Sequence, residues 1–189
     1  MISSKLSIMK TRRTLRHCLW TLLALFGFSA AHADELQAGQ AAPPFALKDQ
    51  SGETHQLSDY AGKWLVVYFY PKDDTPGCTK EACHFRDDIV QLRALGVQIL
   101  GISLDDTESH GQFAAKFSLP FPLLSDAGGN VAKTYDAYWS LGPLHAARRH
   151  TFIIDPAGRI AKVYRKVDPD THSAEVIADV KKLQQHSGS

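Results

Sequence analysis

Two continuous apolar runs, residues 64–70 and 97–104, stand out in the middle of the chain. Runs of this kind are typical of strands that are buried on both faces, and such strands are usually parallel. Between them, residues 79–95 carry apolar side chains at helical spacing. These apolar positions are Ala82, Phe85, Ile89, Leu92 and Leu95. The pattern predicts a strand–helix–strand unit in which Gly96 ends the helix.

The rest of the chain predicts further strands and helices of ordinary length. In chain order these are a hairpin of residues 45–47 and 54–56, helices over 106–117 and 129–135, antiparallel strands 151–155 and 159–165, and a helix over 173–185. Asp126 is the capping candidate for the second of these helices. Pro156 and Gly158 suit a tight turn between the last two strands. This order of elements resembles a thioredoxin-like, three-layer α/β sandwich with a mixed central sheet.

Residues 1–33 have the pattern of a secretory signal peptide. Their five basic residues, Lys5, Lys10, Arg12, Arg13 and Arg16, precede an apolar stretch over 18–30. Ala31-His32-Ala33 then forms a small-x-small cleavage site. Residues 34–189 are therefore predicted to be a single exported domain, periplasmic or otherwise exported. An uncleaved N-terminal anchor is the alternative, and the pair Arg12-Arg13 leaves both the Sec and the twin-arginine export routes open.

The charge of the mature chain gives no reason to expect nucleic acid or an anionic membrane as a partner. The leader holds five of the 21 Lys and Arg residues and none of the 20 Asp and Glu residues, so residues 34–189 have a formal net charge of −4. A basic surface, which such partners require, is not indicated by this balance.

With Cys18 in the leader, Cys78 and Cys83 are the two cysteines of the mature chain. Cys78 is predicted at the start of a helix, where amide dipoles favour a thiolate. In an exported chain two cysteines would ordinarily form a structural disulfide. On one regular helix, however, their Cα atoms would be roughly 8.7 Å apart, beyond the reach of about 7 Å for a disulfide. A bridge would need local unwinding, which indicates a transient disulfide and thiol redox chemistry.

Three segments together resemble one known family. The motif Pro71-x-x-x-Thr75-x-x-Cys78 is similar to the active-site signature of the peroxiredoxins. Residues 79–87, TKEACHFRD, resemble the helix of the peroxiredoxin Q group, also called bacterioferritin comigratory proteins. Residues 149–155, RHTFIID, resemble the strand that bears that family's active-site arginine. The similarity extends from about Gly39 onward.

The resemblance implies a thiol-dependent peroxidase that reduces hydrogen peroxide and organic hydroperoxides. Cys78 would attack the peroxide and become a sulfenic acid, and Cys83 would resolve it to a transient disulfide. A thioredoxin or thioredoxin-like protein would then reduce the disulfide. Arg149 would stabilise the anionic sulfur and the leaving oxygen, Thr75 would orient the peroxide, and Pro71 would limit access of water. From the residues alone, Arg149 could equally be a surface arginine like Arg148, Thr75 a helix cap and Pro71 part of a structural turn. The resemblance also implies a monomer with no cofactor or metal.

Other functions remain open on the residues alone. The stretch Cys78-x4-Cys83-His84 is a lengthened form of the haem-attachment motif, which suggests an exported c-type haem electron-transfer protein. Against it, both methionines of the chain, Met1 and Met9, lie in the leader, where neither can be the usual second axial ligand.

A zinc site would combine the two cysteines with two histidines, but no closely spaced second ligand pair supports it. The candidate histidines are His55, His84, His110, His145, His150 and His172. A thiol–disulfide oxidoreductase would share the fold but usually has two residues between its cysteines. Residues 140–147 are mostly neutral where many relatives of the resembled group are more charged, so the preferred hydroperoxide is left open and the monomer is expected from the resemblance alone.

Overall fold

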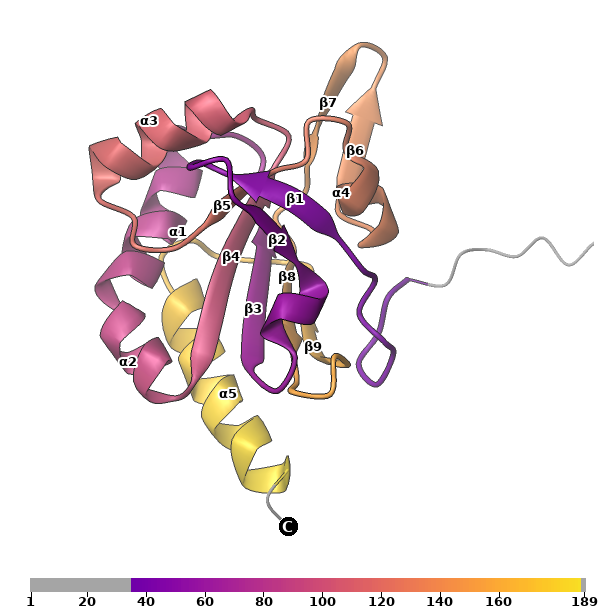
Figure 1. Ribbon diagram of the computed structural model, residues 1–189, viewed down its shortest axis with the longest axis vertical. Helices are drawn as coiled ribbons and strands as arrows, with labels where there is room; N and C mark the ends of the chain where they lie inside the picture. Colours follow the sequence, from indigo (N-terminus) through magenta and orange to yellow (C-terminus); the bar gives the residue numbers. More distant parts are fainter. Residues whose placement is uncertain (1–34, 188–189) are drawn as a thin grey trace, which may run out of the picture. The chain divides into compact units, whose positions relative to one another are not determined.

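A mixed seven-stranded sheet forms the centre of the computed structural model, which describes residues 35–187 (Figure 1). The strand order is β2-β1-β5-β4-β3-β8-β9. The strands span Ala46–Asp49 (β1), Thr54–Gln56 (β2), Trp64–Phe69 (β3), Val97–Ser103 (β4), Leu123–Ser125 (β5), Thr151–Ile154 (β8) and Ile160–Tyr164 (β9). The predicted leader, residues 1–33, lies outside the described residues. Within residues 35–187, no helix is long and apolar enough to cross a membrane.

Helices cover one face of the sheet, and a shorter helix, a 3-10 turn and the N-terminal segment cover the other (Figure 1). The helices span Pro76–Asp87 (α1), Ile89–Ala94 (α2), Thr107–Phe117 (α3), Asn130–Thr134 (α4) and His172–Ser187 (α5), and the 3-10 turn spans Leu57–Tyr60 (η1). Alternate residues of β3 show the two faces. Val66 and Tyr68 lie in the core formed with α1, α3 and α5, whereas Val67 and Phe69 lie in the core formed with α4. The three-layer α/β fold is therefore confirmed.

The central strand–helix–strand unit also has the predicted pairing. All six residues of β3 are buried, and β3 and β4 are parallel. Gly96, which ends the intervening helical segment, has φ +70°, a value that glycine adopts without strain. The hairpin β1–β2 and the antiparallel pair β8–β9 likewise follow the prediction. The N-cap residue of α4 is Gly129 and not the predicted Asp126, but the Asp126 carboxylate accepts hydrogen bonds from the first-turn amides of Asn130 and Ala132.

The single helix predicted over residues 79–95 is wrong in two respects. It begins earlier, at Pro76, because proline in the first helical position suits the missing amide hydrogen and the fixed φ. It is also broken at Asp88, whose φ of −89° and ψ of 2° separate α1 from α2. The Asp88 side chain accepts a hydrogen bond of 2.7 Å from Ser173 on α5. The apolar spacing continues across Asp88 and carries no information about this tertiary contact, so it predicted one helix.

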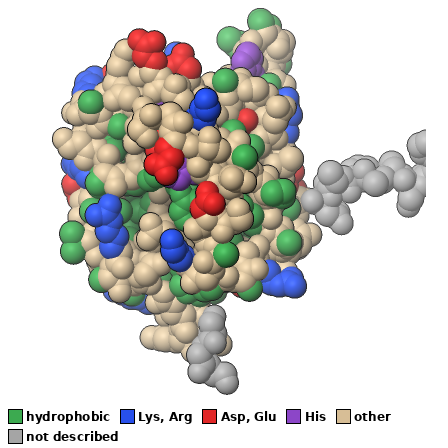
Figure 2. All heavy atoms as spheres, in the orientation of Figure 1, with side chains coloured by type: hydrophobic (Ala, Val, Ile, Leu, Met, Phe, Trp, Pro, Cys, Tyr) green, Lys and Arg blue, Asp and Glu red, His purple; other side chains and the backbone are tan. Residues whose placement is uncertain are grey.

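Strand β5, the 3-10 turn η1 and a hairpin of residues 138–147 have no counterpart in the prediction. The three-residue strand β5 is too short to show an apolar pattern. Residues 138–147 form a second, separate sheet, the hairpin of β6 (Tyr138–Leu141) and β7 (Leu144–Ala147), with Gly142 at φ +59° in its turn. Its tip carries apolar side chains exposed to solvent (Figure 2), Leu141 at 68% and Leu144 at 63%.

Candidate active site

Sheet topology brings the predicted site residues together. Strand β8 runs antiparallel to β3, with Thr151 opposite Tyr68. The start of β8 therefore lies beside the end of β3. The loop after β3 leads into α1 and carries Pro71 and Thr75, and the residues just before β8 include Arg149. Segments about 70 residues apart in the sequence thus meet at one edge of the sheet.

Cys78 is the third residue of α1 and lies in the first turn, where backbone N–H groups have no carbonyl partner within the helix. It is a free cysteine, 2% exposed. The Arg149 guanidinium donates a hydrogen bond from Nη2 to the Cys78 Sγ at 3.2 Å. A fixed positive charge and the N-terminal end of a helix both stabilise an anionic sulfur.

A buried carboxylate holds the other arm of Arg149. Arg149 donates from Nη1 to Glu81 Oε2, and Glu81 is 1% exposed. Burial raises the pKa of Glu81 to about 7, although Arg149 opposes this rise. Burial alone would lower the pKa of Arg149, but Glu81 and the Cys78 sulfur raise it above its ordinary value. The guanidinium is therefore kept charged and oriented toward the sulfur.

Glu81 was not predicted from the sequence, although the helical period contains a signal for it. Glu81 lies one turn after Cys78, next to Ala82 on the face that Phe85 also occupies, and all four residues are buried. A carboxylate on a buried helical face needs a cationic partner. The helical period therefore indicates that an arginine or lysine from another element must reach this face of α1.

The structure also separates Arg149 from its neighbour Arg148, which sequence chemistry alone could not do. Arg148 is exposed, and its Nε donates to the Tyr138 carbonyl at 3.2 Å. The Arg149 side chain is 19% exposed and points to α1. In β8, Ile153 belongs to the core on the α1 face and Phe152 to the core on the opposite face. Extending this alternation backward favours residue 149 over 148 as the one that faces α1.

Gly77 provides space for the guanidinium. A Cβ atom at this position would lie 3.3 Å from Arg149 Nη2. This is tighter than an ordinary van der Waals contact, so a side chain at residue 77 would push the guanidinium away from the sulfur. The approach of Arg149 therefore accounts for a glycine at this position.

Thr75 and Pro71 lie in the loop beside the site. Thr75 is the N-cap residue of α1, but its side chain makes no capping hydrogen bond, so the predicted side-chain cap is wrong. The Thr75 hydroxyl instead donates to the Lys72 carbonyl at 3.0 Å. The hydroxyl proton is used in this hydrogen bond, and the lone pairs of the hydroxyl oxygen remain free to accept a hydrogen bond from a ligand. Pro71 is partly buried at the beginning of this loop.

Cys83 lies on the same helix as Cys78, five residues further on, and is also a free cysteine. It is partly buried, whereas Cys78 is buried. Because α1 is continuous from Pro76 to Asp87, the helical separation of roughly 8.7 Å between the two Cα atoms applies. A disulfide between them is incompatible with this helix.

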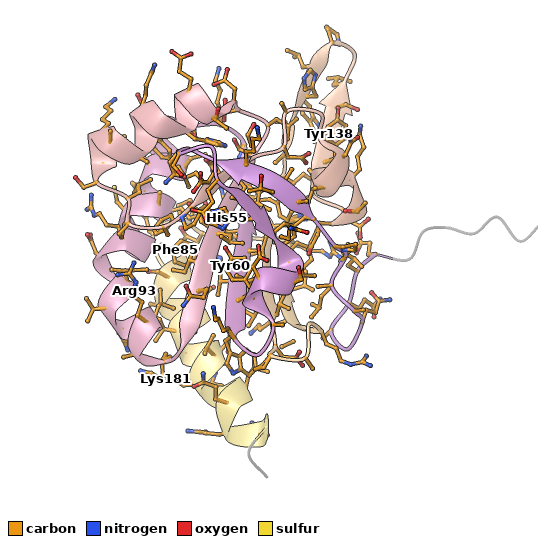
Figure 3. The ribbon with its side chains drawn as sticks, in the orientation of Figure 1. His55, Tyr60, Phe85, Arg93, Tyr138 and Lys181 are labelled. Atoms are coloured by element: carbon orange, nitrogen blue, oxygen red, sulfur yellow. The ribbon has the colours of Figure 1, made fainter. Side chains whose placement is uncertain are left out.

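Buried aromatic and polar side chains pack against α1 on its core side. Phe85, labelled in Figure 3, is fully buried and packs against Tyr68 and His172, with ring centroids 5.1 and 5.6 Å away. Burial, followed by the nearby Glu81 and Cys78, raises the pKa of Tyr68 well above its ordinary value. Burial, with Arg149 nearby, lowers the pKa of His172 to about 4, so this imidazole is neutral at pH 7.

The arrangement does not suit a metal at the cysteines. Arg149 occupies the position beside the Cys78 sulfur, where its positive charge would repel a cation. Within residues 35–187, the side chains close enough together to share a metal ion are Asp49, Glu53 and His55, and neither cysteine is among them. His55 lies on β2 and contacts the Tyr60 hydroxyl at 2.7 Å (Figure 3), away from α1.

Comparison with known proteins agrees with this geometry. The AhpC/TSA family matches residues 38–163. The peroxiredoxin Bcp of Bacillus subtilis is 44% identical over 155 residues, which cover 79% of this chain and 98% of the relative. The chloroplastic peroxiredoxin Q of Populus jackii is 44% identical over 145 residues, which cover 76% of this chain and 67% of the relative.

Solved structures give the same result. Peroxidoxin BcpB from Mycobacterium tuberculosis superposes with a TM-score of 0.74 at 33% identity, covering 78% of this chain and 98% of that chain. Peroxiredoxin Q from Xanthomonas campestris superposes with a TM-score of 0.72 at 34% identity, covering 77% and 97%. The resemblance expected from the sequence motifs is therefore confirmed: the chain belongs to the AhpC/TSA family of peroxiredoxins, in the group of the Bcp and peroxiredoxin Q proteins.

Proposed function

We propose that this chain is a thiol-dependent peroxidase that reduces hydrogen peroxide and organic hydroperoxides through Cys78. The observation that carries the proposal is the 3.2 Å hydrogen bond from Arg149 Nη2 to the Cys78 sulfur in the first turn of α1. A sulfur placed in this way is stabilised as the thiolate, which is the nucleophilic form of cysteine. Family membership, over residues 38–163, supports the same reaction.

In the first step the Cys78 thiolate attacks the terminal oxygen of the hydroperoxide. An S–O bond forms to that oxygen, the O–O bond breaks, and the other oxygen leaves as water or an alcohol once it has taken a proton. Arg149 is already directed at the sulfur and can stabilise the negative charge that moves onto the leaving oxygen. The lone pairs of Thr75 Oγ1 can accept a hydrogen bond from the peroxide O–H. Pro71 shields the site from water.

In the second step the Cys78 sulfenic acid condenses with the Cys83 thiol, which forms a disulfide and releases water. Because both residues lie on the continuous helix α1, the helix must unwind before the sulfurs can bond. The disulfide is then reduced to two thiols by a thioredoxin or thioredoxin-like dithiol, which is itself oxidised to a disulfide.

The substrate range includes alkyl hydroperoxides in this proposal. One structural relative, the bacterioferritin comigratory protein of Xanthomonas campestris, is described as having alkyl peroxide reduction activity. That protein is 33% identical to this chain over 77% of it. The c-type haem protein and the thiol–disulfide oxidoreductase, the alternatives considered from the sequence, are not favoured by the family match.

We also propose that the mature protein, residues 34–189, is exported, periplasmic or otherwise, and acts as a monomer without attachment to a membrane. The support is the signal-peptide pattern of residues 1–33 and the resemblance of the domain to the peroxiredoxin Q group. The expected mass of the purified native protein is that of a chain beginning at Asp34. Light scattering should give the mass of one such chain, and recovery of the full-length chain in the membrane fraction would contradict export as a cleaved protein.

The reaction is tested by following peroxide consumption by residues 34–189 with thioredoxin, thioredoxin reductase and NADPH. Consumption should depend on both the chain and thioredoxin. In Cys83→Ser, a sulfenic acid on Cys78 should be trapped by dimedone and located by mass spectrometry. Absence of the adduct together with absence of peroxide consumption would refute the proposal.

A further inference from the structure

Asp73 is a buried carboxylate that the proposed reaction does not use. It lies in the loop between β3 and α1 and is 7% exposed. Its carboxylate accepts hydrogen bonds from the Tyr70 hydroxyl at 2.7 Å, the Ser109 hydroxyl at 2.7 Å and His110 Nδ1 at 2.8 Å. Burial would raise the pKa of Asp73, but these hydrogen bonds, chiefly that from His110, hold it below its ordinary value.

The main chain of Asp73 is held as well. Its amide donates to Asp105 Oδ2 at 2.9 Å, and the same oxygen accepts a hydrogen bond of 2.7 Å from the Ser103 hydroxyl. Ser103 ends β4, and Ser109 and His110 belong to the first turns of α3. Asp73 therefore fastens the loop before α1 to a neighbouring strand and helix through both its side chain and its backbone.

The neighbouring residue shows that this loop needs support. Asp74 has φ +54°, a left-handed conformation that is uncommon outside glycine and that persists only where the surroundings hold it. Its carboxylate pairs with Lys116 of α3 at 2.6 Å, but both side chains are at least half exposed. Exposed ion pairs contribute little to stability. The buried, charge-assisted hydrogen bonds of Asp73 are the stronger restraint.

We propose that Asp73 is a positioning residue that fastens the active-site loop to α3 and thereby restrains the unwinding of α1. The proposal rests on the proposed function, because the two chemical steps need different conformations of that helix. Peroxide attack needs the first turn of α1 intact beneath Arg149, whereas disulfide formation needs it unwound. Asp73 thus favours attack over resolution.

Hydrogen exchange on the reduced protein, without peroxide, tests the restraint itself. In Asp73→Asn the side chain keeps its size but loses the charge that attracts three donors. The α1 amides that are hydrogen-bonded within the helix, from Thr79 onward, should therefore exchange about 10-fold faster. Amides of β3 and β4 should be unchanged. Asp74→Asn is the matched control, because asparagine tolerates the left-handed conformation and only an exposed ion pair is lost. Its exchange should stay within about twofold of wild type.

Single-turnover kinetics test whether the restraint by Asp73 favours peroxide attack over disulfide formation. Asp73→Asn should form the sulfenic acid more slowly and the Cys78–Cys83 disulfide faster, so the two rates move in opposite directions. A general loss of stability would instead accelerate exchange throughout the sheet and would not divide the two rates in this way. Equal α1 exchange in wild type and Asp73→Asn, or a slowing of both chemical steps, would overturn the proposal.

Two safeguards keep the outcome interpretable. If Asp73→Asn does not fold, Ser109→Ala removes one partly exposed donor and should shift exchange in the same direction by a smaller factor; no shift would overturn the proposal. If wild type consumes no peroxide while Asp73→Asn still accelerates α1 exchange, the peroxidase function fails and the restraint by Asp73 stands.

Discussion

The first and second halves of α1 differ in a way that divides the reaction between two conformations. In the first turn, Cys78 is 2% exposed, close to the helix N-terminus and hydrogen-bonded to Arg149. More than one turn later, Cys83 is only partly buried and lies too far along the helix to reach the first sulfur. The resting fold is therefore arranged for attack on a peroxide, and the disulfide belongs to another arrangement of the same helix.

The largest expected effect is that of Cys78→Ser. A serine hydroxyl is not ionised at neutral pH and is a poor nucleophile toward peroxide, so the first turnover should fall by at least about 1000-fold. Rapid-quench measurement of peroxide after mixing with reduced protein gives this rate. An unchanged first turnover would show that the buried first-turn sulfur is not the reacting group.

Cys83→Ser should affect only the second step, in which the sulfenic acid is converted to a disulfide. The first turnover should keep the wild-type rate, because Cys78 and Arg149 are untouched. Catalytic cycling with thioredoxin should stop after the first turnover, and the sulfenic acid should accumulate. In excess peroxide it should be oxidised to the sulfinic acid, which consumes one further equivalent of peroxide. Mass spectrometry of the intact protein follows both products. Continued cycling at the wild-type rate would show that Cys83 is not the resolving thiol.

Arg149→Ala should slow the attack of Cys78 on peroxide without abolishing it. The loss of a charge-assisted hydrogen bond to the sulfur, and of a cation beside the leaving oxygen, should slow attack by about 100-fold. Arg148→Ala is the matched control and should change the rate by less than about twofold, because the Arg148 side chain is exposed and donates to the Tyr138 carbonyl rather than to the sulfur. Equal effects of the two variants would contradict the assignment.

The smallest expected effect is on the free energy of unfolding, and it tests whether His172 is buried as a neutral imidazole. The pKa of His172 is lowered to about 4 by burial and Arg149, whereas an unfolded histidine has a pKa of 6.5. Below pH 6.5 the unfolded chain binds a proton that the folded chain does not, so stability falls as the pH drops from 6.5 to about 4. His172→Gln removes this loss.

The comparison is made by urea unfolding of wild type and His172→Gln at pH 7 and pH 4.5. The free-energy difference between the two proteins should shrink by about 2 kcal/mol at the lower pH. A difference that is the same at both pH values would show that His172 titrates equally in the folded and unfolded states.

The fold was largely predictable because its central strands are buried on both faces. β3 is a continuous apolar run and every residue of β4 except Gln98 is buried, and a helix-covered sheet accommodates such strands. The break at Asp88 was not predictable from the apolar spacing, which continues from α1 into α2; at the break the Asp88 side chain accepts a hydrogen bond from Ser173, 85 residues away. The exposed hairpin of residues 138–147 was missed because its sequence shows no alternation that marks a buried face.

The site was predictable where one short motif contains it and was missed where it depends on contacts across the fold. The segment from Pro71 to Cys83 places both cysteines and Thr75 in a single loop and helix. Glu81 lies in the same segment, but its role became apparent only once Arg149 was found against it. The importance of Asp73 depends on donors from α3, which only the three-dimensional structure brings to it.

Stopped-flow mixing of reduced residues 34–189 with one equivalent of hydrogen peroxide, followed by mass analysis of each cysteine, tests the central claim most directly. The account predicts rapid loss of peroxide, one oxygen added at Cys78, and then a disulfide between Cys78 and Cys83 that appears in a separate, slower phase. Oxidation that begins at Cys83, or a Cys78 that stays reduced while peroxide is consumed, would contradict it.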